Sequence, residues 1–159
     1  MAQVAVSTLP IEDEESMEDE ESVEDESVED LEAAFAMPIL LAVSHIHQHL
    51  IRTGQRLDTS IVAYSGECRE VHHLATLIGY GANAVVPYLA HYTIEDLTAA
   101  GRLEGTVEQN IDTFSQTLSA GVIKVMAKMG ISTVQSYQGA QIFEAIGLGK
   151  DVIDQYFTG

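Results

Sequence analysis

The sequence predicts an α/β fold in which parallel βα units follow an acidic N-terminal leader. From Pro38 onward, apolar stripes at helical spacing alternate with short β-branched runs, and glycines or prolines separate them. Before Pro38, acidic side chains dominate: 14 of the chain's 25 Asp and Glu residues lie between Glu12 and Glu32, and all 7 Lys and Arg come later. We therefore divide the 159 residues into a leader, 1–37, and an α/β region, 38–159.

The leader is expected to be disordered. A six-residue acidic repeat begins at Glu15 and again at Glu21, and it contains few apolar side chains. Like charges at this density repel one another and bury little surface, so the entropy cost of ordering is not offset. Two interpretations stay open. The leader is either an acidic tail for a basic partner, with serines that could accept phosphate, or a solvated extension without a specific role.

The first half of the α/β region predicts two helix–strand pairs. Ile39, Val43, Ile46 and Leu50 form an apolar stripe on a helix that starts at Pro38 and stops near Gly54. A buried strand is expected over 60–64, then a helix over 71–78 and a second strand over 84–86. Short turns between these elements favour parallel strands with helical crossovers.

The second half is expected to be more helical. A capping pair, Thr93 and Asp96, predicts a short helix that ends near Gly101, and Thr106 with Gln109 predicts a capping box for a long helix. Gly121 is expected to break or kink that long helix. The remaining expected elements are a third strand over 132–136, a helix over 139–146 and a last short helix capped by Asp151.

Composition excludes several classes of protein. Seven basic residues are too few for a nucleic-acid-binding face. One cysteine, Cys68, excludes an intramolecular disulfide, a cysteine-ligated iron–sulfur cluster and a cysteine-type structural zinc site. No apolar run is long enough to cross a membrane, and the leader does not have the pattern of a secretory signal. We expect no nucleic-acid or membrane partner, and a cytoplasmic location.

Histidines are the first candidate ligands. His45 and His49 lie one turn apart on the first helix, with His47 directed elsewhere, and the glutamate of the HExxH metal motif is absent. We prefer solvated or backbone-bonded imidazoles to a metal site. The adjacent His72 and His73 diverge on a helix and cannot chelate together. We expect one of them to be semi-buried and the other exposed.

Strand-end residues are the other candidates. Tyr64, Glu67 and Tyr137 follow predicted strands, where catalytic loops of barrels lie, although turn chemistry explains them equally simply. Cys68 has His72 one turn away as a candidate base, but a small buried thiol is the simpler interpretation. The turn Gly79-Tyr80-Gly81 follows a helix and precedes a strand, so it is a helix stop rather than a phosphate loop. We predict no catalytic, cofactor-binding or metal-binding residue.

Long runs of the α/β region resemble the glutamate synthase large chain. The resemblance covers residues 38–159 and is to the C-terminal half of that family's central domain. The runs that carry it are Pro38–Ser44, His47–Arg52, Glu70–Leu74, Leu77–Ala82, Pro87–Ala90, Gly121–Tyr137, Gly139–Ala145, Val152-Ile153 and Tyr156–Gly159. The resemblance implies a partial, half TIM-barrel-like fold. It also implies a region that connects a glutaminase domain to a flavin-binding domain.

The family forms glutamate from glutamine and 2-oxoglutarate, with flavin mononucleotide (FMN) and an iron–sulfur cluster in the parent enzyme. This chain has Ala2 where the glutaminase nucleophile would stand, and it lacks the cluster cysteines. We therefore expect a fragment without autonomous catalysis and without a bound cofactor. Expected partners are the remaining domains or subunits of the enzyme, or further copies through exposed sheet edges. The alternatives are an acidic-tailed interaction scaffold, or a small enzyme that uses Glu67 and Tyr137.

Overall fold

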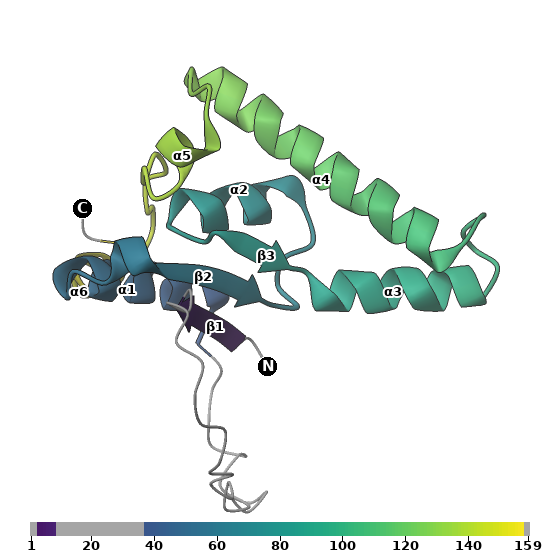
Figure 1. Ribbon diagram of the computed structural model, residues 1–159, viewed down its shortest axis with the longest axis horizontal. Coiled ribbons are helices and arrows are strands. Elements are labelled where there is room, and N and C mark those ends of the chain that lie inside the picture. The colour runs from purple at the N-terminus through teal and green to yellow at the C-terminus, as the bar shows by residue number, and fades with distance from the viewer. Residues whose placement is uncertain (1–2, 9–36, 158–159) are drawn as a thin grey trace, which may run out of the picture.

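The computed structural model describes residues 3–8 and 37–157 of the chain (Figure 1). It contains both helices and strands, with one parallel strand pair, and is compatible with the predicted α/β class. In chain order the elements are β1 (Gln3–Thr8), α1 (Ile39–Arg52), the 3-10 helix η2 (Arg56–Asp58), β2 (Thr59–Tyr64), α2 (Val71–Gly79), β3 (Ala84–Val86), α3 (Tyr88–Ala99), α4 (Val107–Met129), α5 (Val134–Tyr137) and α6 (Lys150–Tyr156).

The described strands form one sheet in the order β1-β2-β3. β2 and β3 are parallel, with Val62 opposite Ala84, and α2 provides the crossover between them, as predicted. β1 pairs with β2 in the antiparallel direction, with Gln3 opposite Tyr64. This strand differs from the expected disorder of the leader. The segment Gln3–Thr8 carries no charge and contains β-branched residues, and such a segment suits a sheet edge. The acidic repeat lies outside the described residues.

Two cores share helix α2. The first core joins α1, β2 and α2 through Ile39, Val43, Leu50, Ile61, Ala63, Cys68, Leu77 and Ala82. The second lies between α2, α4 and α5 and contains Ala75, Val122, Met126 and Tyr137. Figure 1 shows the result: α2 lies between the sheet and the long α4, and α6 lies beside α1.

Helix α4 is continuous through Gly121, so the expected break or kink at this glycine is wrong. A Cβ atom placed on Gly121 would lie 2.3 Å from Cγ2 of Val71, at the start of α2. The glycine therefore lies where the two helices approach each other closely. The predicted capping box is confirmed: the Thr106 side chain accepts from the Gln109 backbone, and the Gln109 side chain accepts from the Thr106 backbone.

Helix α3 begins at Tyr88, directly after Pro87, and not at the predicted Thr93 cap. Inside the helix, the Thr93 hydroxyl donates to the carbonyl of Leu89 at 2.7 Å. The expected end near Gly101 is confirmed. Proline in the position before the helix sets the start, because it fixes its own φ and has no N–H to satisfy.

The predicted third strand at 132–136 and helix at 139–146 are both wrong. Thr133 caps a single helical turn, α5, by accepting from the Ser136 backbone at 3.3 Å. Beyond it, Gly139 has φ 68° and Gln141 has φ 50°, which stop any helix. The backbone N–H groups of Gly139 and Gln141 donate instead to the carbonyls of Ile78 and Gly79. The segment is thereby tied to the end of α2. The last short helix, α6, is confirmed, but its predicted cap is wrong: Gly149 is the N-cap, and Asp151 lies inside the first turn.

Candidate functional site

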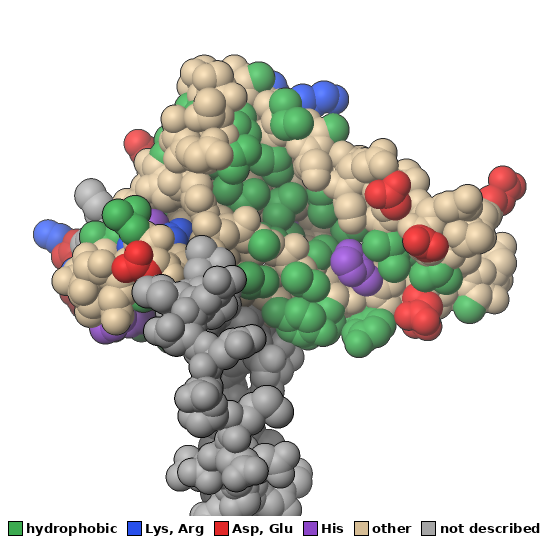
Figure 2. Space-filling view, in the orientation of Figure 1, with side chains coloured by type: hydrophobic (Ala, Val, Ile, Leu, Met, Phe, Trp, Pro, Cys, Tyr) green, Lys and Arg blue, Asp and Glu red, His purple; other side chains and the backbone are tan. Residues whose placement is uncertain are grey.

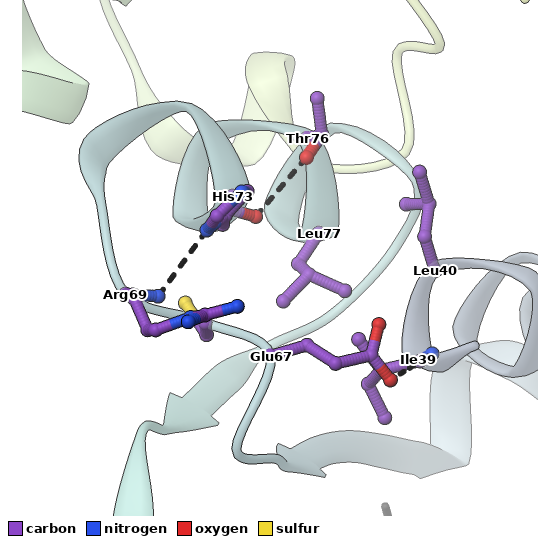
Figure 3. A pocket seen from close by; sticks show the side chains of 8 residues that line it. Ile39, Leu40, Glu67, Arg69, His73, Thr76 and Leu77 are labelled. Carbon is purple, nitrogen blue, oxygen red and sulfur yellow. Dashed lines mark hydrogen bonds between the residues drawn. The ribbon is translucent and has the colours of Figure 1, made fainter. Parts of the chain in front are cut away.

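A cavity of about 320 Å³ opens between the start of α1 and the loop and helix that follow β2 (Figure 3). It collects more of the candidate side chains than any other described site. Its lining consists of Ile39, Leu40, Glu67, Cys68, Arg69, His73, Thr76 and Leu77. The cavity lining therefore shows which of the predicted strand-end residues lie together.

Glu67 reaches across the cavity to the first helix. Its Oε1 accepts from the backbone N–H of Ile39 at 3.1 Å, as the dashed line in Figure 3 shows. The first N–H groups of a helix have no partner inside it, and a carboxylate at this end also interacts favourably with the helix dipole. Because Pro38 supplies no side-chain cap, Glu67 acts as the cap of α1 from the neighbouring loop.

Cys68 is the buried thiol that the simpler interpretation predicted. Only 1% of its surface is exposed, and burial raises the pKa of its thiol to about 11. A thiol nucleophile reacts as the thiolate, so this environment suppresses reactivity. His72, the candidate base, is not among the residues that line the cavity, and it lines the groove between α2 and α4 instead. The Cys68–His72 pair is therefore not assembled.

His73 is the histidine that the cavity does contain. Its Nδ1 accepts from the Arg69 backbone at 3.2 Å, and its Nε2 lies 3.6 Å from Oε1 of Glu70. Both His72 and His73 are exposed, so the expectation that one of them would be semi-buried is wrong. Both histidines lie in the first turn of α2, and the buried positions of that helix begin later, at Ala75 and Leu77.

Tyr137 and Tyr64 lie apart from the cavity. Tyr137 is fully buried in the second core, where its hydroxyl donates to the Ala75 carbonyl at 3.0 Å. Tyr64 stacks on Tyr88 at the end of β2, with ring centroids 4.6 Å apart. Glu67 and Tyr137 share no cleft among the described residues, which contradicts the hypothesis of a small enzyme built on this pair.

His47 is the centre of a second polar cluster. It is 7% exposed, and its Nδ1 accepts from Nε of Arg56 at 2.8 Å. The same guanidinium donates to the carbonyls of Thr59 and Gly81 at 2.7 and 2.9 Å and to Oδ1 of Asn83 at 3.1 Å. Burial, and then the positive charge of Arg56, lower the pKa of His47. The imidazole is thereby held neutral as an acceptor.

The other histidines of α1 do not join His47. His45 lies against the ring of Tyr156 at a centroid distance of 5.5 Å, and His49 is exposed. Across residues 3–8 and 37–157, no three His, Cys, Asp or Glu side chains are grouped closely enough to hold a metal ion.

The turn after α2 is the helix stop that the sequence predicts. Helix α2 ends at Gly79, and Gly81 has φ 116°. A Cβ atom on Gly81 would lie 2.4 Å from Nδ1 of His47, so the space beside the glycine already contains the imidazole. The turn holds a side chain of α1 rather than presenting an open cradle of N–H groups for phosphate.

Sequence reasoning missed Arg56, Asn83 and Gln138. Besides the contacts above, Oδ1 of Asn83 accepts from the Ile61 backbone at 2.8 Å, and Nε2 of Gln138 donates to the Ala82 carbonyl at 3.0 Å. No local motif marks these residues, because each acts on backbone distant in the sequence. Together they join η2, β2, the turn after α2 and the segment after α5.

In both clusters, central polar side chains bind backbone: Glu67 binds the N–H of Ile39, and Arg56 binds the carbonyls of Thr59 and Gly81. The cavity therefore contains a capping carboxylate and a protonated thiol but no nucleophile with an assembled base. None of the helices in the described part of the chain has the length and apolar character that a bilayer crossing requires.

Comparison with known proteins identifies relatives of this sequence. A family model described as glutamate synthase central domain matches residues 18–149. The glutamate synthase (NADPH) large chain of Bacillus subtilis is 58% identical over 123 residues, which cover 77% of this chain and 8% of that protein. Ferredoxin-dependent glutamate synthase 1 of Arabidopsis thaliana is 46% identical over 134 residues, covering 78% and 8%. Glutamate synthase (NADH) of Saccharomyces cerevisiae is 44% identical over 128 residues, covering 76% and 6%. The chain thus spans only 6–8% of the length of these relatives.

Proposed function

This chain belongs to the glutamate synthase central-domain family, and from that membership we propose that it serves as a structural connector within such an enzyme rather than as a reaction centre. The connector would hold a glutaminase domain and a flavin-binding domain in register. In the whole enzyme, the reaction would be glutamate formation from glutamine and 2-oxoglutarate. The proposed location of the enzyme is the cytoplasm.

One observation carries the proposal: three of the chemistry-bearing side chains, Glu67, Tyr137 and Arg56, are used to bind backbone. Glu67 caps α1, Tyr137 donates to Ala75, and Arg56 joins two carbonyls to His47. Buried polar groups that are fully paired make a region rigid. They are then poorly placed to exchange protons with a substrate. Side chains fastened in this way suit a rigid spacer between two active sites.

The residues present do not fit the iron–sulfur cluster of the parent enzyme. Such clusters need several cysteine thiolates, whereas this chain has one cysteine, whose buried thiol has a pKa of about 11. We propose that the chain binds neither the cluster nor FMN, and that other regions of the enzyme carry both. We further propose that β2, α2, β3 and α3 form part of a half TIM-barrel-like arrangement.

Replacement within a relative tests the connector role. Residues 38–159 of this chain would replace the matching stretch of the Bacillus subtilis large chain, and glutamine-dependent amination of 2-oxoglutarate would be measured. We expect the chimera to be active and the 159-residue chain alone to show no turnover. A Cys68→Ser chimera should keep the kcat of the unmodified chimera. Turnover by the chain alone, or an assembled Cys68→Ser chimera with much reduced kcat, would overturn the proposal.

A further inference from the structure

Three tyrosines and a leucine form a patch at the end of the sheet, which we call the tyrosine surface: exposed Tyr64, Leu89 and Tyr92 and half-buried Tyr88. Tyr64 ends β2, and the other three lie in the first turns of α3. The Tyr64 and Tyr88 rings stack at 4.6 Å, and the Tyr88 and Tyr92 rings meet edge to face at 6.1 Å. The three rings therefore form a continuous ladder across two elements.

The ladder is exposed although it is apolar. Exposed fractions are 36% for Tyr64, 46% for Leu89 and 56% for Tyr92, and α3 contributes no buried residue. Figure 2 shows hydrophobic side chains gathered where α3 begins, with acidic side chains farther along the helix. A contiguous apolar patch of this kind on a folded surface marks an interaction site more often than chance exposure does.

The loop after β2 also holds the tyrosine surface in place. A Cβ atom on Gly66 would lie 3.2 Å from the Tyr88 hydroxyl and 3.3 Å from Cβ of Leu89, so the loop after β2 packs directly under the ladder. Tyrosines have few rotatable bonds, and fixed ones lose little entropy when a partner binds. Tyrosine is also enriched among the residues that dominate binding energy at protein interfaces.

We propose that the tyrosine surface is the docking face for the adjoining polypeptide of a glutamate synthase large chain. This inference rests on the proposed function. In the relatives the matching stretch is only 6–8% of the protein, so most of the polypeptide lies outside it and is available to cover an apolar face. In addition, β3, which leads into Tyr88, pairs only with β2 among the described strands, so its other edge is unpaired there. The occupant is an apolar protein segment, because the ladder offers rings and no charge.

Nitration of tyrosines with tetranitromethane tests the docking face. The 159-residue chain and the active Bacillus subtilis chimera would be treated alike, and nitration would be read by mass spectrometry at each tyrosine. We expect Tyr64 and Tyr92 to be nitrated in the isolated chain and several-fold less in the chimera. Tyr137, which is fully buried, is the internal reference that stays unmodified in both.

The outcomes separate the two proposals. An active chimera whose Tyr64 and Tyr92 react as they do in the isolated chain would overturn the docking face and leave the connector role standing. An unassembled, inactive chimera would overturn both. Protection that rises with the concentration of the isolated chain would assign the face to a second copy and also overturn the inference.

A pair of variants provides an independent readout. Leu57 is 98% exposed in η2, just before β2, whereas Tyr64 ends that strand, so Leu57→Ser is a control at the opposite end of the same strand. In the chimera, Tyr92→Ser should lower the midpoint of thermal inactivation and Leu57→Ser should not. Equal midpoints for the two variants would contradict docking at the tyrosine surface.

Discussion

Replacing Gly121 by alanine sets two opposing effects against each other. Alanine in place of glycine inside a helix stabilises it by about 1 kcal/mol, because glycine loses more backbone entropy on folding. Here, however, the added Cβ would lie 2.3 and 2.7 Å from the two methyl carbons of Val71. Overpacking of this kind costs about 1–3 kcal/mol. We therefore expect Gly121→Ala to destabilise the chain by about 1 kcal/mol.

Val71 decides whether Gly121→Ala stabilises or destabilises the chain, because the methyl groups of this valine cannot easily move aside. Valine is branched at Cβ and strongly prefers one rotamer in a helix. Removing both methyl groups with Val71→Ala leaves only its Cβ near the new atom, at 3.1 Å. In that background Gly121→Ala should become neutral or stabilising, by up to about 1 kcal/mol. The two substitutions are therefore expected to be non-additive.

Urea unfolding of the four variants of the cycle, followed by circular dichroism, measures the coupling. Ala120→Gly, at the neighbouring exposed position of α4, calibrates the helix propensity and should cost about 1 kcal/mol. The close approach of α2 and α4 would be refuted if Gly121→Ala stabilised the chain equally with valine or alanine at position 71.

Three further predictions concern protonation, capping and burial. The folded chain holds the pKa of His47 below 6.5, so the unfolded chain binds more protons near that pH. The stability that neutral His47 contributes is therefore present above pH 6.5 and lost as pH falls through the lowered pKa; urea unfolding against pH should show this slope, and His47→Gln should flatten it. Thr106→Ala removes one bond of the capping box and should cost about 1 kcal/mol in thermal unfolding, whereas exposed Ser119→Ala should change stability by less than about 0.5 kcal/mol. Cys68 should react with a disulfide reagent at neutral pH only as fast as the chain opens, and rapidly in denaturant. Fast labelling of the native chain would contradict its burial.

Local signals predicted those elements whose ends are set by neighbours in sequence. The stripe from Ile39 to Leu50 gives α1 its buried face, and the reciprocal bonds of Thr106 and Gln109 start α4. The strand Thr59–Tyr64 follows from a short run with β-branched residues, from which a buried strand over 60–64 is predicted. Periodicity and capping act over a few residues, so they can be read without knowledge of the fold.

Elements decided by distant contacts could not be predicted in this way. Residues 132–136 have strand-like composition, yet the Thr133 side chain starts a helical turn there. The N–H groups of Gly139 and Gln141 bind the end of α2 instead of continuing a helix. Glycine is typical of a helix break, but the role of Gly121 depends on Val71, which belongs to another helix.

The same limit applies to the candidate site. Proximity to strand ends correctly directed attention to Glu67, because it does line a cavity. It could not show that the carboxylate is taken by the backbone of Ile39. The tyrosine surface has no sequence signal for a similar reason: only the fold places Tyr64 beside Tyr88 and Tyr92.

The enclosure of His47 constrains the order of events on the ribosome. Its ring packs against Gly81 on one side, and a Cβ on Gly139 would lie 2.9 Å from its Nε2 on the other. The nascent chain emerges from its N-terminal end, so α1 is made long before the segment that closes over it. Until residue 139 leaves the exit tunnel, the Nε2 side of this imidazole is not covered and stays accessible to water.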